Sequence, residues 1–188
     1  MRVAILLGAT SQIAKDLIRS LSAQGNQGNQ GNQGNQGNQG NQGLTLFARR
    51  PAALHQWLES VGLFGRHSVF DYAAFGAEKA FNAIINFVGV GNPADAQAMG
   101  ASIFDVTYKY DELALQHVRQ HPECRYIFLS SGAVYGGSFD APVDQNTKAL
   151  LPINDVKPHD WYGVAKLHTE FRHRSMPHLP IIDLKVFN

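Results

Sequence analysis

Apolar and polar positions along the chain form blocks that predict strands and helices in alternation. Short, largely apolar runs typical of strands in a buried parallel sheet occupy residues 3–7, 44–48, 68–70, 83–88, 125–130 and 181–187. The segments between them predict helices at 11–23, at 52–60, at 102–120 within a longer helical region that begins at residue 93, and at 161–174. Because strands and helices alternate six times, the pattern predicts an α/β fold with a doubly wound parallel sheet.

The first predicted strand ends in a tight turn that opens the first helix. Gly8 follows the strand at once, and Ser11 and Ala14 stand where a Gly-x-x-Gly-x-x-Gly fingerprint would place its other glycines. Unpaired N–H groups and the helix dipole favour a diphosphate there, so the turn predicts a dinucleotide site of the Rossmann type. An ordinary strand-to-helix turn without a ligand is the alternative. The residues expected to contact the dinucleotide at this turn are Gly8, Thr10, Ser11, Gln12 and Ile13.

On the same helix, Ile13, Leu17, Ile18 and Leu21 lie on one face at helical spacing. It is followed by a Gly-Asn-Gln triplet that repeats six times across 25–43. The repeat has no apolar residue to bury, so we expect a disordered surface loop. An Asn/Gln-rich tract could instead drive self-association, but a glycine at every third position argues against it.

Composition narrows the classes of protein that the chain can represent. Its 188 residues, 44% of them hydrophobic, suit one domain over 1–188. A net charge of +1, with no basic stripe, suggests neither a nucleic acid nor a membrane as partner. Cys124 is the one cysteine, and we expect it to be a packed core residue. Strand residues directly after Met1 and Arg2 leave no room for a signal peptide, so we expect a cytoplasmic protein.

Candidate chemistry is concentrated after the fifth predicted strand. That strand ends in Ser-Ser-Gly-Ala-Val-Tyr-Gly over 130–136, at the sheet edge where ligands of α/β folds bind. Downstream, Tyr162 and Lys166 lie four residues apart on one helix face, where the ammonium should lower the pKa of the phenol. Taken singly, Ser131 could be a surface serine, Tyr162 a packed aromatic residue and Lys166 a solvated lysine.

Five signals in order give the chain its resemblance to a known family. They are the Gly8 turn, the strand ending at Asp71, Ser-Ser-x-x-Val-Tyr-Gly, Tyr-x-x-x-Lys, and the closing Leu-Lys-Val-Phe-Asn. The chain resembles the extended short-chain dehydrogenase/reductases, in the NAD(P)-dependent epimerase/dehydratase branch. The resemblance implies that Ser131 binds the substrate oxygen, that Tyr162 transfers its proton, and that Lys166 holds the nicotinamide ribose. It also implies that Asp71 and Tyr72 lie beside the adenine and that Phe87 to Gly89 pass under the cofactor. Asn188 is expected to contact the substrate.

The end of the second strand bears on the choice of cofactor. NAD-preferring relatives usually carry an acidic residue there, whereas this chain has Ala48 followed by Arg49 and Arg50. Two guanidinium groups suit a 2′-phosphate, so we expect NADP rather than NAD. Two solvated surface arginines are the alternative.

The chain also departs from the family pattern. Thr107 falls where many relatives carry an asparagine, which puts a proton relay through that helix in doubt. Gly132 and Ala133 replace the Asp-Glu pair of sugar dehydratases, which argues against dehydration. Beyond Asn188 we would expect a substrate-binding domain, which is missing here. The oligomeric state is open, although relatives commonly form homodimers through the helix that carries Tyr162.

These observations predict an NADP-dependent oxidoreductase or epimerase that transfers hydride at a sugar carbinol or ketone, with a nucleotide-sugar as the small-molecule substrate. A non-catalytic dinucleotide-binding module, either a truncated product or a redox-sensing interaction protein, is the alternative. A scaffold without a cofactor is a third. His117 and His121 have the spacing of a metal pair, but we expect no metal, because imidazolium at a helix C-terminus explains them better.

Overall fold

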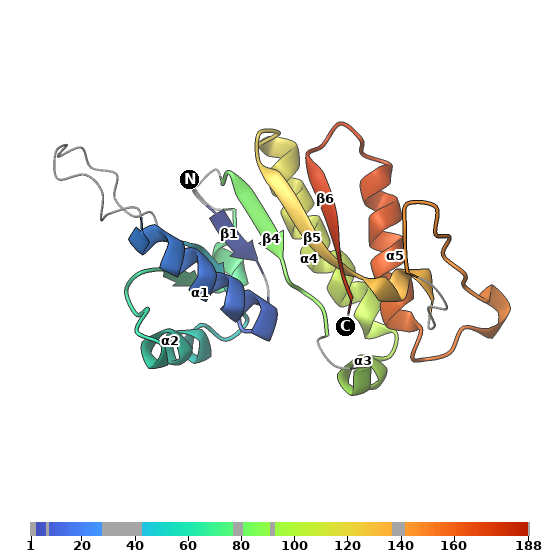
Figure 1. Cartoon of the computed structure of the whole chain (residues 1–188), viewed down its shortest axis with the longest axis horizontal. Helices are drawn as coiled ribbons and strands as arrows, with labels where there is room; N and C mark the ends of the chain where they lie inside the picture. Colours follow the sequence, from blue (N-terminus) through green and yellow to red (C-terminus); the bar gives the residue numbers. More distant parts are fainter. Residues whose placement is uncertain are drawn as a thin grey trace. The chain divides into compact units, whose positions relative to one another are not determined.

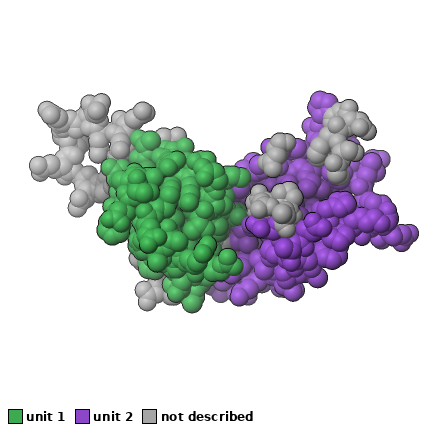
Figure 2. Space-filling view, turned by 90° about the horizontal axis from the view of Figure 1, so that it is seen from below, with its two compact units in different colours: residues 1–87 green, residues 88–188 purple. Residues whose placement is uncertain are grey.

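The computed structural model describes residues 3–6, 8–27, 43–76, 81–90, 93–136 and 142–187. The chain divides into two compact units, residues 1–87 and 88–188, which Figure 2 shows in green and purple. The expectation of a single domain stays a prediction. Within the described ranges, no helix combines the length and the apolar character that crossing a membrane requires.

The described residues of unit 1 form four parallel strands in the order β3-β2-β1-β4. Figure 1 labels the neighbouring strands β1 and β4. The strands are β1 (Val3–Leu6), β2 (Thr45–Phe47), β3 (Ser68–Phe70) and β4 (Ala83–Asn86). The helices are α1 (Gln12–Gln27), α2 (Pro51–Ser60) and the short 3-10 helix η1 (Tyr72–Ala74). From β1 to β3, each successive strand is added on the side away from β4, as expected for one half of a doubly wound sheet.

Local sequence explains where the helices of unit 1 begin and how they pack. Ser11 caps α1, since its Oγ accepts a hydrogen bond from the N–H of Ala14 at 3.3 Å. Pro51, which has no N–H to leave unpaired, opens α2. The core between the helices and the strands is fully buried and includes Ile18, Leu46, Phe47, Leu54, Leu58 and Ile84.

The predicted end of α1 was wrong, because the helix continues to Gln27, into the first triplet of the repeat. Ile13 on this helix is 50% exposed, whereas Ile18 is fully buried. The rest of the repeat, residues 28–42, lies outside the described residues.

Unit 2 contains the parallel pair β5 (Arg125–Ser131) and β6 (Ile181–Val186). Its helices are α3 (Pro93–Met99), α4 (Ser102–Gln120), α5 (Trp161–Arg174) and the 3-10 helices η2 (Gly132–Tyr135) and η3 (Ile153–Asp155). Both α4 and α5 pack on β5 (Figure 1). Side chains of β5 alternate, so that Tyr126, Phe128 and Ser130 are buried while Ile127 and Leu129 are only half-buried.

Ionic pairs connect α5 with β6 on the buried side. Glu170 Oε2 accepts from Lys185 Nζ at 3.0 Å, and His173 Nδ1 lies 2.5 Å from Asp183 Oδ1. The other imidazole nitrogen, Nε2, lies 2.8 Å from Asp111 Oδ1 on α4. These groups link α4, α5 and β6 within unit 2.

In the part of the chain that the structure describes, six strands in parallel pairs, with helices between them, confirm the predicted α/β fold class. The bounds of β3, α4 and α5 are those predicted, and the other elements differ from prediction by a few residues at their ends.

Candidate functional site

Gly8 makes the turn after β1 with a backbone conformation that other residues adopt at a cost. Its φ is +72°, and a Cβ there would lie 2.7 Å from the carbonyl oxygen of Phe87. Phe87 is itself buried and follows β4. The two predicted residues therefore meet, and the close approach of the backbones requires glycine at position 8.

The sequence suggested that the N–H groups at this turn are unpaired. In the structure, some of them already donate to acceptors within the chain. The N–H of Gly8 donates to the Tyr72 hydroxyl at 3.2 Å, and that of Ala14 donates to Ser11. The N–H groups of Gln12 and Ile13, in the first turn of α1, have no acceptor within the helix. An anion at this turn would therefore be met by Gln12 and Ile13 rather than by Gly8.

The exits of β2 and β3 carry the other predicted cofactor residues of unit 1. Arg49 and Arg50 are exposed and follow the buried Ala48. Asp71 caps η1, since its Oδ1 accepts from the N–H groups of Ala73 and Ala74 at 2.9 and 3.2 Å. Thr10 is exposed at the same turn as Gly8. Of these residues, the structure brings Tyr72 into contact with Gly8.

Unit 2 brings together the three residues that the sequence singled out for chemistry. Ser131 ends β5, whereas Tyr162 and Lys166 lie on one face of α5. Ser131 lies near enough to Tyr162 for its side chain to lower the pKa of the phenol. Lys166 Nζ lies 5.9 Å from the centre of the Tyr162 ring. Gly89 completes the group, because a Cβ there would lie 3.2 Å from Lys166 Nζ and 3.9 Å from the Tyr162 ring.

Gly163 on α5 explains how the helix comes so close to η2. A Cβ on Gly163 would lie 2.6 Å from the carbonyl oxygen of Ala133 in η2. The helix can approach this short 3-10 helix only because position 163 lacks a side chain. That approach places the neighbouring Tyr162 beside Ser131.

Lys166 is 2% exposed, and its ammonium is held by backbone and an aromatic face. Nζ donates to the carbonyl oxygens of Val88 at 2.9 Å and Leu129 at 2.8 Å. It lies 4.3 Å from the centre of the Phe128 ring. Burial lowers the pKa of Lys166 to about 8, although the charge of Asp111 opposes the shift.

The expected effect of Lys166 on Tyr162 was wrong for this structure. Burial raises the pKa of Tyr162, and only the side chain of Ser131 acts to lower it. The ammonium of Lys166 is directed to the two carbonyl groups instead. The phenol is therefore in its protonated form at neutral pH.

The positions that depart from the family pattern are also defined by contacts. A Cβ on Gly132 would lie 2.5 Å from the ring of Phe187, which stacks on Tyr135 with ring centres 6.5 Å apart. A carboxylate side chain at 132 would require that ring to move. Thr107 is buried on α4, and Asn188 lies outside the described residues.

Cys124 is fully buried, which confirms it as a core residue, and burial raises its pKa to about 11. The explanation given for His117 was wrong, because burial lowers its pKa and keeps the ring neutral. Its ring lies 4.4 Å from that of His121. The described residues contain no cluster of three or more metal-ligating side chains.

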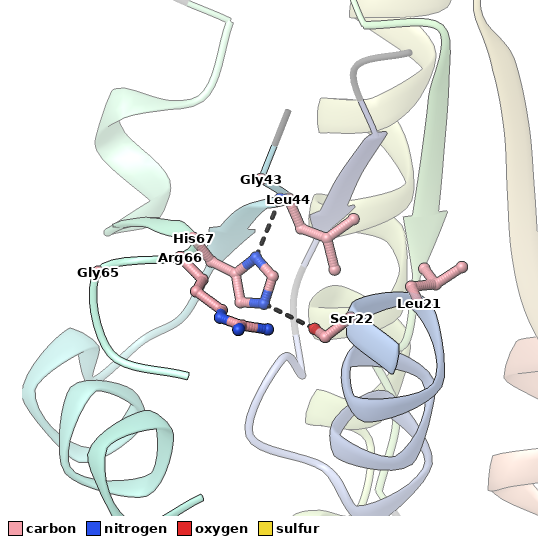
Figure 3. Close-up of a pocket in the computed structure, with 7 residues that line it drawn as sticks. All are labelled: Leu21, Ser22, Gly43, Leu44, Gly65, Arg66 and His67. Carbon is pink, nitrogen blue, oxygen red and sulfur yellow. Dashed lines mark hydrogen bonds between the residues drawn. The ribbon is translucent and has the colours of Figure 1, made fainter. Parts of the chain in front are cut away.

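A hollow of about 220 Å³ opens at the other ends of β2 and β3, before these strands begin (Figure 3). His67 bridges it: Nδ1 accepts from the N–H of Leu44 at 3.1 Å, and Nε2 lies 2.9 Å from Ser22 Oγ. Ser22 donates its own proton to the carbonyl oxygen of Ile18 at 2.6 Å. Burial and the charge of Arg66 lower the pKa of His67. This Ser-His pair fastens α1 to the strands and is not arranged as a nucleophile and base.

Sequence reasoning missed Phe128 and the carboxylates around α5. Phe128 reads as an ordinary core residue of a strand. Glu170 lies four residues after Lys166, and that spacing was the available signal that it shares the inward face of α5. Its Oε1 accepts from Ser130 Oγ at 2.6 Å, beside Ser131.

Fold and site together define the class of this protein. Alternating strands and helices, a glycine turn after β1, and a serine, tyrosine and lysine gathered at the end of β5 are features of dinucleotide-binding α/β proteins. The family model for "NAD dependent epimerase/dehydratase family" matches residues 4–175. The chain belongs to this family.

Solved structures agree on the fold. A UDP-glucose 4-epimerase from Bifidobacterium longum, solved with NAD+ and UDP, is 20% identical with a TM-score of 0.66. The match covers 94% of this chain and 49% of that one. A dTDP-glucose 4,6-dehydratase from Streptomyces venezuelae, solved with NAD and TYD bound, is 15% identical with a TM-score of 0.73, covering 98% and 55%. None of the curated proteins searched matches the sequence. The chain thus spans about half the length of these solved relatives.

Proposed function

We propose that the chain is the dinucleotide-binding half of an NADP-dependent oxidoreductase or epimerase that acts on a nucleotide-linked sugar. The observation that carries the proposal is that Ser131, at the end of β5, lies near Tyr162, beside the buried ammonium of Lys166. The names of the solved relatives, which include UDP-glucose 4-epimerase and dTDP-glucose 4,6-dehydratase, support the substrate class.

The described residues fit a nicotinamide dinucleotide. Gly8 lets the turn after β1 lie against Phe87, Gly89 keeps a side chain away from Lys166, and Ile13 offers an exposed apolar side chain next to the turn. Gln12 and Ile13 would meet the diphosphate, Arg49 and Arg50 a 2′-phosphate, and Asp71 and Tyr72 the adenosine. When bound, the cofactor supplies or accepts a hydride at its nicotinamide ring.

The chain's own residues handle the proton. In reduction of a ketone, Tyr162 gives its phenolic proton to the substrate oxygen as that oxygen gains negative charge, and Ser131 holds the same oxygen by a hydrogen bond. Lys166 holds the nicotinamide ribose, as the family resemblance implies, and solvent returns the proton to the phenolate that remains. A Tyr162 that is protonated at neutral pH suits the direction of reduction.

A titration and one substitution test the proposal. We expect NADPH fluorescence to change on binding, and Tyr162→Phe to bind NADPH as tightly as the unaltered chain while losing turnover of a nucleotide-linked ketosugar. Tyr108→Phe, at an exposed position of α4, is the matched control and should retain turnover. No change of NADPH or NADH fluorescence at any concentration would contradict the proposal.

Half-length coverage favours one alternative, a module that binds a dinucleotide without catalysis. It predicts the same NADPH binding, but no turnover in either the unaltered chain or the Tyr162→Phe variant. A homodimer through α5 remains a prediction, which sedimentation of the intact chain would test.

A further inference from the structure

The ammonium of Lys166 is buried without a carboxylate in direct contact among the described residues. Its two hydrogen bonds go to the carbonyl oxygens of Val88 and Leu129, and these account for two of its three N–H donors. Asp111 is the carboxylate that acts on it, yet its oxygens accept from Tyr126, Arg172 and His173. Something else must offset the lost hydration of the charge.

The ring of Phe128 is in place to do so. Lys166 Nζ lies 4.3 Å from the ring centre, within the distance at which an aromatic face attracts a cation. Phe128 is fully buried, so water screens the attraction little. The Tyr162 ring, at 5.9 Å, is farther away.

Neighbouring rings fix the orientation of Phe128. His173 meets it at 84° with ring centres 5.2 Å apart, and Tyr126 meets it at 61° and 6.4 Å. Both neighbours are in turn held by Asp111. The Phe128 face is therefore presented to Lys166 by packing that extends from α4 through α5.

We propose that Phe128 is a positioning residue of the candidate site: its ring face holds the Lys166 ammonium in place and in charged form at the end of β5. The proposal rests on the role proposed for Lys166 above. Phe128 is fully buried, so it would act through Lys166 and not by touching a ligand itself. Titratable groups on the surrounding elements are Asp111 on α4, Tyr162, Glu170 and His173 on α5, and Asp183 and Lys185 on β6.

Fluorinated phenylalanines separate the electrostatic role of the ring from its packing. Fluorine atoms weaken the negative face of the ring while changing its volume little. We would place 4-fluoro-, 3,4,5-trifluoro- and pentafluorophenylalanine at position 128 and titrate Lys166 by NMR of 15N-labelled lysine side chains. The Lys166 signal is the one absent from Lys166→Arg.

We expect the pKa of Lys166 to fall stepwise with the number of fluorine atoms, by about half to one and a half units in total. Pentafluorophenylalanine at Phe47, a buried ring of unit 1, should leave it unchanged. A Lys166 pKa that is the same across the series would overturn the proposal. Phe128→Leu should lower the pKa, and Phe128→Tyr, which keeps a ring face, should restore it.

This titration needs neither cofactor nor turnover, so it is independent of the proposed function. A pKa that follows the fluorine count supports the role of Phe128 even where NADPH does not bind. If NADPH binds but the pKa of Lys166 is the same across the fluorine series, the proposed dinucleotide site stands and the proposed role of Phe128 is wrong.

Discussion

The imidazole of His173 should make unit 2 less stable as the pH rises from 6.5 to 9. Both ring nitrogens face carboxylates, Asp111 at 2.8 Å and Asp183 at 2.5 Å, so both must carry protons. Burial by itself would lower the pKa of His173, but the hydrogen bonds and charges of the two carboxylates outweigh it and raise the pKa to about 9. The folded chain therefore binds this proton more tightly than the unfolded chain.

The magnitude follows from linkage. A rise from 6.5 to about 9 corresponds to about 3 kcal/mol of unfolding free energy, at the order of magnitude. This contribution is fully present below pH 6.5 and is lost as the pH passes through the folded-state pKa. About 2 kcal/mol should be gone by pH 8. Above pH 8 the lowered pKa of Lys166 acts in the opposite direction, so the interval from 6.5 to 8 gives the clearest measurement.

Urea unfolding followed by tryptophan fluorescence would measure it. The two tryptophans lie in different units, so Trp57→Phe leaves Trp161 on α5 as a reporter of unit 2. His173→Gln should remove most of the slope between pH 6.5 and 8. His168→Gln, at an exposed position of the same helix, should keep it. Equal stability at pH 6.5 and 8 in the parent, or an unchanged slope in His173→Gln, would refute the reasoning.

Two further predictions concern unit 1. Gly8→Ala should destabilise it by about 1–3 kcal/mol more than Gly62→Ala, measured by urea unfolding with Trp57 as the reporter. Both glycines have positive φ, but only at Gly8 would the Cβ meet the carbonyl of Phe87, so equal losses would contradict the close approach. Arg49→Ala should lower the ratio of NADPH to NADH affinity by about 10- to 100-fold, whereas Arg66→Ala, away from the β2 exit, should not. Similar affinities for the two cofactors before substitution would count against NADP.

Patterns that depend on neighbouring residues were predictable from the sequence. Helix α5 begins and ends where its polar and apolar spacing indicates, and Tyr162 and Lys166 share a face because four residues complete about one turn. The glycine turn at Gly8 followed from the strand before it. The family resemblance stated on these motifs is confirmed by the match over residues 4–175.

Contacts between distant residues were not predictable in the same way. The sequence predicted that the charge of Lys166 would act on Tyr162. The ammonium instead donates to the carbonyl groups of Val88 and Leu129, which are 78 and 37 residues away. Burial then decides the direction of both pKa shifts, and burial depends on the packed fold. Likewise, the N–H of Gly8 donates to the hydroxyl of Tyr72, which is 64 residues further along the chain and which only the fold brings close.

The order of charges along α5 and β6 has a consequence for assembly. Along α5, Glu170 comes before His173, and along β6, Asp183 comes before Lys185. Glu170 pairs with Lys185 and His173 with Asp183, so the opposite charges meet in only one alignment of the strand with the helix. Sliding the strand by two residues would set Glu170 against Asp183 and leave like charges facing each other away from water. The outward residues of β6, Ile182 and Leu184, are half-exposed aliphatic side chains. Because they are similar in size and polarity, they would tolerate such a slip. Electrostatic repulsion on the buried side thus disfavours a β6 that pairs out of register with β5.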